Sequence, residues 1–141
     1  MTQRHTPEIH AVPHGVLDYL RDRYQGDIAL IVIHNGWIPP SHWEDQKISY
    51  YMDIEFDDTS DPNDTQYRPI TKDQARIIAN FIKDVYDRVD HIVCSCVAGL
   101  SRSPGVGAAI CKKYHLDDNE IYNGTYPNSL VKQLVYEALD N

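Results

Sequence analysis

One short stretch of the sequence, residues 93–104 (VCSCVAGLSRSP), combines residue types that suit attack on a phosphorus atom. Cys96 offers a thiolate nucleophile. Arg102, after five intervening residues, offers a planar guanidinium group that matches two oxygens of a tetrahedral oxyanion. Gly99 lies midway between them and permits a backbone conformation that a side chain would obstruct, and Ser103 follows the arginine. This combination favours a site for phosphoryl transfer.

The elements predicted around this stretch would position it as an anion-binding cradle. His91–Ser95 is a short apolar run typical of a strand, and a helix is predicted from about Arg102 to Tyr114. A loop between a strand and a helix can turn successive backbone N–H groups inward around an anion, and the helix N-terminus adds a partial positive charge. The same field should favour the thiolate form of a cysteine at the start of the loop.

The other segments indicate an α/β fold. Strands are predicted over Ile28–Ile33 and Ile48–Phe56, and helices over Pro13–Gln25, from Thr71 to about Val89, and near Ser129–Leu139. Alternation of strands and helices predicts three layers, with a mostly parallel central sheet flanked by helices. The chain has 141 residues and no linker-like segment, so we expect a single domain over residues 1–141.

Composition and charge exclude several other classes of protein. The longest apolar run has six residues, Ile28–Ile33, whereas a membrane span needs about 20, and the polar segment Met1–His10 does not resemble a signal peptide. A net charge of −8 argues against nucleic acid or an anionic membrane as the main partner. The odd number of cysteines, three, suits a reducing compartment, so we expect a cytoplasmic protein.

The 93–104 stretch resembles the Cys-x5-Arg phosphate-binding loop of the protein tyrosine phosphatase superfamily, in the longer form Cys-x-x-Gly-x-x-Arg-Ser. With this composition, chance would produce the longer pattern in about 4 of 10,000 sequences. The loop lies about two-thirds along the chain, after a strand and a long helix. That place is similar to the compact dual-specificity phosphatases and unlike the low-molecular-weight phosphatases, whose loop is near the N-terminus.

Further segments resemble the small bacterial and phage members of this group, namely Phe56-Asp-Asp58, Gln74-Ala75, Phe81-Ile82 and Tyr126-Pro-Asn128. The resemblance covers roughly Ile48 to the C-terminus, and the first 45 residues fit it only loosely. One position departs from the family, which usually has a histidine immediately before the nucleophile where this chain has Ser95. That histidine helps to organise the loop, so a pseudophosphatase that binds phosphate without turnover remains an alternative.

The resemblance implies a mechanism without metal or cofactor. Cys96 would form a phosphocysteine intermediate, and the phosphate would be bound by Val97, Ala98, Gly99, Leu100, Ser101, Arg102 and Ser103. An upstream aspartate would protonate the leaving oxygen. Asp58, at the end of the predicted Ile48–Phe56 strand, fits this role best, with the adjacent Asp57 and the later Asp64 as alternatives.

We therefore expect a monomeric phosphatase that acts on phosphotyrosine or a related phosphomonoester, in a phosphorylated protein or a small molecule. An RNA 5′-triphosphatase, which some relatives are, is disfavoured by the net charge of −8. Cys94 and Cys111 are expected to be core thiols rather than redox partners. His10 and His14 lie four residues apart, but Pro13 interrupts them and no third ligand is near in sequence, so no metal site is expected there.

Overall fold

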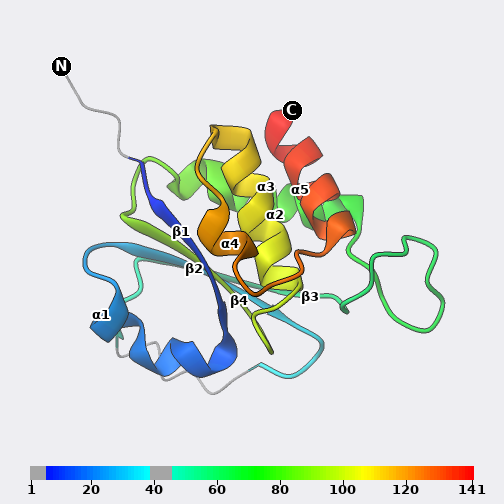
Figure 1. The fold of residues 1–141 in the computed structure, drawn as a ribbon, viewed down its shortest axis with the longest axis horizontal. Coiled ribbons are helices and arrows are strands. Elements are labelled where there is room, and N and C mark those ends of the chain that lie inside the picture. The colour runs from blue at the N-terminus through cyan, green and yellow to red at the C-terminus, as the bar shows by residue number, and fades with distance from the viewer. Residues whose placement is uncertain (1–5, 39–45) are drawn as a thin grey trace.

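The computed structural model describes residues 6–38 and 46–141, which form a β-sheet covered by helices on both faces (Figure 1). The strands of the described residues are β1 (Glu8–Pro13), β2 (Ile28–His34), β3 (Tyr50–Glu55) and β4 (His91–Cys96), in the spatial order β1-β4-β2-β3. All pairings between them are parallel, so the carboxyl ends of the strands lie on the same side of the sheet. The predicted α/β fold with a parallel central sheet is confirmed.

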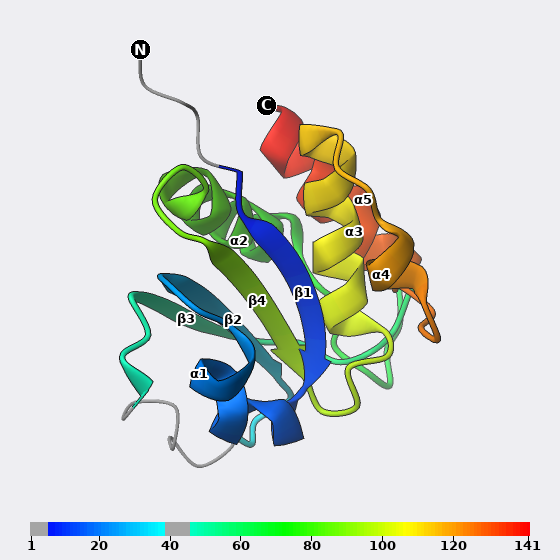
Figure 2. The ribbon, with the colours of Figure 1, turned by 60° about the vertical axis from the view of Figure 1, so that its left-hand side comes forward.

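The sheet separates two apolar layers, and Figure 2 shows the helices that cover them on either side of the strands. The larger layer is covered by α2 (Lys72–Val85), α3 (Arg102–Tyr114) and α5 (Ser129–Asp140). The smaller layer is covered by the 3-10 helix η1 (His14–Tyr19) and the single turn α1 (Leu20–Arg23). Strand β2 is buried along its whole length because its residues face these two layers alternately.

Two of the long helices begin at side-chain caps. The Thr71 hydroxyl accepts a hydrogen bond from the Gln74 amide, and the Gln74 side chain accepts one from the Thr71 amide, which confirms the capping box predicted for α2. The side-chain oxygen of Asn128 accepts hydrogen bonds from the amides of Leu130 and Val131 at the start of α5. Helix α3 runs over the residues that the sequence predicted.

The first quarter of the chain differs from the prediction. The helix predicted over Pro13–Gln25 is a 3-10 helix followed by one α-turn, in a segment that contains Gly15. Strand β1 was not predicted, because its buried residues Ile9 and Val12 are three positions apart and show no alternation.

The short helix α4 (Asn119–Tyr122) was also missed. No helix in the described part of the chain is long and apolar enough to span a bilayer.

Candidate active site

The loop over residues 97–101 joins the carboxyl end of β4 to the N-terminus of α3. Gly99 has a φ of +69°, a conformation that favours glycine. A Cβ at this position would also collide with the backbone of Val12 and Pro13 on the neighbouring strand β1. The loop therefore packs directly against an edge strand, and the glycine is required for both its conformation and its close approach.

Cys96 ends β4 and is almost completely buried, with 3% of its surface exposed. The Ser103 hydroxyl lies 3.2 Å from the Cys96 Sγ, and the Ser103 backbone N–H points at the same sulfur from 3.4 Å. Two donors aimed at one sulfur stabilise a negative charge on it. Ser103, on the first turn of α3, thus lies beside the Cys96 sulfur.

Arg102 is the first residue of α3, and its side chain is held in the interior with 7% exposed. Its Nη1 donates a hydrogen bond of 2.9 Å to the carbonyl of Phe56, immediately after β3. A buried guanidinium needs acceptors for its remaining N–H groups. The anchored side chain therefore places a fixed positive charge at the carboxyl end of the sheet, where an oxyanion could supply those acceptors.

Asp58 contacts the loop directly. Its Oδ1 accepts a hydrogen bond of 2.7 Å from the Ser101 hydroxyl and one of 2.9 Å from the side-chain amide of Asn128. The same amide donates to the carbonyl of Thr59 at 3.1 Å. These contacts join three segments that are distant in sequence, and they hold the Asp58 carboxylate beside the loop.

The two alternative aspartates have other partners. Asp57 accepts a hydrogen bond of 2.7 Å from the Arg68 amide and forms an ion pair with the Arg68 side chain. Asp64 accepts hydrogen bonds from the Tyr67 and Gln66 amides and the Thr59 hydroxyl, and these bonds lower its pKa. A carboxyl group with a lowered pKa is protonated less often at neutral pH, so it has a proton to donate less often. Both side chains stabilise the acidic loop internally.

Comparison with known proteins identifies the fold. DUSP15 matches with 23% identity and a TM-score of 0.62, over 97% of this chain and 85% of that one. PTP-2 phosphatase of Cydia pomonella matches with 9% identity and a TM-score of 0.64, over 96% and 90% of the two chains. PTPMT1, solved in complex with PI(5)P, matches with 12% identity and a TM-score of 0.61, over 94% and 90%.

The chain has the fold of the compact dual-specificity phosphatases. No family model matches its sequence, and no curated protein matches it either.

In this phosphatase fold the segment 126–128 holds the loop from outside. The Tyr126 amide donates to the carbonyl of Leu100 at 2.8 Å, and the Asn128 amide donates to the carbonyl of Ser101 at 2.9 Å. A cavity of about 350 Å³, lined in part by Asp58, Ser101 and Tyr126, lies beside this contact. In the sequence Tyr126-Pro-Asn128 is visible only as a resemblance, because nothing in its composition shows which loop it contacts.

Ser95, at the position where this group of phosphatases usually has histidine, hydrogen-bonds a histidine from elsewhere. Its Oγ lies 2.5 Å from Nδ1 of His14, and both side chains are buried. Burial lowers the pKa of His14 to about 4, and the charge of Arg102 contributes to the shift. The imidazole is therefore neutral at pH 7. The sequence carries no signal for this pair, because 81 residues separate its members.

The other two thiols of the chain, Cys94 and Cys111, are buried in the core. Cys94 is fully buried between the sheet and the helices, and burial raises its pKa strongly. Burial also raises the pKa of Cys111 to about 11. Both are core thiols, as expected, and neither is ionised at neutral pH.

The loop side chains Val97 and Leu100 are about half exposed, at 51% and 48%, and give the rim of the loop an apolar surface.

Proposed function

We propose that this protein is a cysteine-dependent phosphatase that hydrolyses phosphotyrosine or a related phosphomonoester through a phosphocysteine intermediate. The observation that supports it most is the convergence of Cys96, Arg102 and Asp58 on one loop, each held by its own hydrogen bonds. A nucleophile, a fixed cation and a proton donor are the three groups that hydrolysis of a phosphomonoester requires.

In the first step the Cys96 thiolate attacks phosphorus, and the bond from phosphorus to the leaving oxygen breaks. The Arg102 guanidinium and the backbone amides of residues 97–102 hold the three non-bridging oxygens. They stabilise the charge on these oxygens in the transition state. Asp58 gives its proton to the leaving oxygen, so the product departs as an alcohol or phenol rather than as an anion.

In the second step water attacks the phosphocysteine. Asp58, now ionised, takes a proton from this water, the bond between sulfur and phosphorus breaks, and inorganic phosphate is released. The electron pair returns to Cys96, where the hydroxyl and amide of Ser103 stabilise the thiolate. The cycle restores both the thiolate and the protonated carboxyl group, and it needs no metal or cofactor.

The substrate of this mechanism is a phosphorylated protein or a small phosphomonoester. The half-exposed side chains of Val97 and Leu100 offer apolar contacts to an aromatic ring attached to the phosphate. The net charge of −8 disfavours nucleic acid as a substrate. We propose that the enzyme is monomeric and has a single domain. We also propose that it works in the reducing cytoplasm, because Cys96 must remain a thiolate.

A pseudophosphatase is the second candidate function, favoured by Ser95 in place of the usual histidine. The hydrogen bond between His14 and Ser95 counts against it, because it supplies a neutral imidazole at the position next to the nucleophile. A pseudophosphatase would bind inorganic phosphate or a phosphopeptide in the same loop without releasing product.

Hydrolysis of para-nitrophenyl phosphate distinguishes the two functions. We expect turnover by the wild type, none above background for Cys96→Ser, and unchanged turnover for the control Cys111→Ser. Absence of turnover in the folded wild type, or full activity of Cys96→Ser, would falsify the enzymatic proposal.

The general acid is assigned by replacing Asp57, Asp58 and Asp64 singly with Asn. We expect only Asp58→Asn to remove the alkaline limb of the pH–rate profile, because this limb reports loss of the acid's proton. It should also lower turnover of a phosphotyrosine peptide by about 100-fold or more. A larger effect at either alternative aspartate would move the role to that residue.

A further inference from the structure

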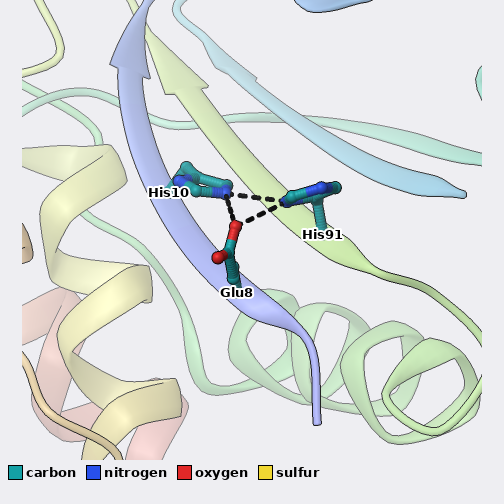
Figure 3. A group of neighbouring side chains, drawn as sticks. All are labelled: Glu8, His10 and His91. Carbon is teal, nitrogen blue, oxygen red and sulfur yellow. Dashed lines mark hydrogen bonds and ion pairs between the residues drawn. The ribbon is translucent and has the colours of Figure 1, made fainter. Parts of the chain in front are cut away.

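A second cluster of chemically active side chains lies at the start of the sheet, far from the loop. Glu8 and His10 are two residues apart on β1, so their side chains project from the same face. His91 opens β4 and is the register partner of Glu8. Figure 3 shows the three side chains pointing toward one another from these two strands.

The separations of the three groups match those of ligands around one ion. His10 Nε2 lies 3.0 Å from His91 Nδ1, and Glu8 Oε2 lies 3.2 Å from His91 Nδ1 and 3.7 Å from His10 Nε2. Ligands about 2.1 Å from a tetrahedral zinc ion are about 3.4 Å apart from one another. One ion can therefore contact all three atoms with only small adjustments of the side chains.

The surroundings of His91 fix the nitrogen that faces the cluster. Its Nε2 lies 2.9 Å from the carbonyl of Gln25, which can only accept a hydrogen bond, so Nε2 carries a hydrogen. The other ring nitrogen, Nδ1, faces His10 and Glu8. A ligating histidine that donates its other N–H to a backbone carbonyl is the usual arrangement around protein-bound metals.

His10 is held equally firmly. Tyr24 stacks on its ring with a centroid separation of 4.1 Å, and it also contacts the His91 ring at 5.1 Å. The side chains of His10 and His91 are only 13% and 11% exposed, whereas Glu8 is 70% exposed and leaves one side of the cluster open to solvent.

The geometry points to a binding site for one zinc-like divalent transition metal ion, with His10 Nε2, His91 Nδ1 and a Glu8 carboxylate oxygen as protein ligands. Two imidazoles and one carboxylate favour zinc and its neighbours over magnesium or calcium, which prefer oxygen ligands. Water would take the remaining position on the open side at Glu8.

This site is separate from the loop that carries Cys96. The two residues His91 and Cys96 open and end the same strand, so about 16 Å of extended chain separates them. A bound ion would join the edge strand β1 to β4 and stabilise the sheet there. The proposal does not depend on phosphatase activity. In the sequence His10 is paired only with His14, four residues later. In the structure His14 hydrogen-bonds Ser95 instead, and His10 hydrogen-bonds His91.

Isothermal titration of tag-free, metal-free protein with zinc tests the proposal. The Cys96→Ser background is used so that zinc cannot bind at the catalytic thiolate. We expect one zinc ion per chain and an increase in melting temperature on binding. Glu8→Gln, His10→Gln and His91→Gln should each weaken binding at least tenfold. His115→Asn is the matched control, because His115 is exposed at the left-handed end of α3, where asparagine is well tolerated.

The exposed Glu8 keeps the test decisive if either histidine variant fails to fold. Cobalt substitution gives a second readout, since tetrahedral cobalt with nitrogen and oxygen ligands has a visible spectrum that Glu8→Gln should change. The proposal is overturned if the folded parent shows no saturable zinc binding. It is equally overturned if Glu8→Gln binds as tightly as the parent, or if His115→Asn loses as much affinity as the cluster variants.

Discussion

Asn128 has two separable functions, and exchanging it for aspartate removes only one of them. Its side-chain oxygen caps α5, while its side-chain N–H2 donates to the Asp58 carboxylate and the Thr59 carbonyl. Aspartate caps a helix as well as asparagine does. Asn128→Asp therefore keeps the cap, removes the donor to Asp58 and places a second carboxylate where the amide was, 2.9 Å from the first.

The expected magnitudes follow from these contacts. Asn128→Ala loses a cap, worth about 1 kcal/mol, and two hydrogen bonds worth about 1 kcal/mol each. It should therefore reduce the free energy of unfolding by about 3 kcal/mol, which lowers the melting temperature by about 10 °C in a chain of this size. In Asn128→Asp the cap is kept, but repulsion moves Asp58 away from the leaving group. Because a general acid contributes about 100-fold or more, we expect turnover of a phosphotyrosine peptide to fall by about 10- to 100-fold.

The assay compares two substrates and one control variant. Loss of the proton donor affects a phosphotyrosine peptide more than para-nitrophenyl phosphate, whose leaving group departs readily without a proton. Thr71→Ala removes the cap of α2, whose hydrogen bonds are with Gln74 and not with Asp58 or the loop. It should lower stability by about 1 kcal/mol without changing turnover. Equal losses on both substrates, or wild-type turnover of the peptide by Asn128→Asp, would refute the assignment of Asn128 as the residue that positions Asp58.

Three further predictions concern the loop, the buried histidine and the helix contact. Gly99→Ala should abolish turnover and lower the melting temperature, because its Cβ meets the backbone of β1; an active Gly99→Ala enzyme would contradict the packing described here. The pKa of His14 is lowered to about 4, so below its ordinary value of about 6.5 the unfolded chain takes up a proton that the folded chain does not. Stability should therefore decrease as the pH falls from about 6.5 to 4, and less steeply in His14→Gln, as urea unfolding at several pH values will show. Gly105→Ala places a Cβ 3.0 Å from the Asn128 carbonyl and the Val131 side chain and should destabilise by about 1–3 kcal/mol, which thermal melting checks.

The strongest local patterns predicted the elements that the structure contains. The apolar run of β2 and the capping box of α2 carry their own signals, so no knowledge of their neighbours was needed. The start of α3 at Arg102 followed from the motif itself. Strand β1 carried no such signal, since it is an edge strand whose burial is set by β4 and by the loop at Gly99.

The candidate site likewise contains residues that the sequence predicts and contacts that only the structure shows. Cys96, Arg102 and Ser103 lie within eight residues of one another, so their spacing alone places all three around one predicted loop. Asp58 is the preferred aspartate because it follows β3, but spacing alone does not exclude Asp57 or Asp64. The contact of Asp57 with Arg68 and that of Asp64 with the Tyr67 amide appear only in the structure. The pairing of His14 with Ser95 depends on a separation of 81 residues, and no local pattern encodes it.

The contact of Gly99 with Val12 and Pro13 has a consequence for how the protein acquires activity. The loop next to Cys96 takes its shape against a strand that is more than eighty residues earlier in the chain. Contacts of such long sequence separation form slowly during folding, because a large part of the chain must be closed first. Regain of turnover after dilution from denaturant therefore reports the docking of β1. Turnover should therefore return later than the helical circular-dichroism signal, and the delay between them gives the time at which β1 docks against the loop.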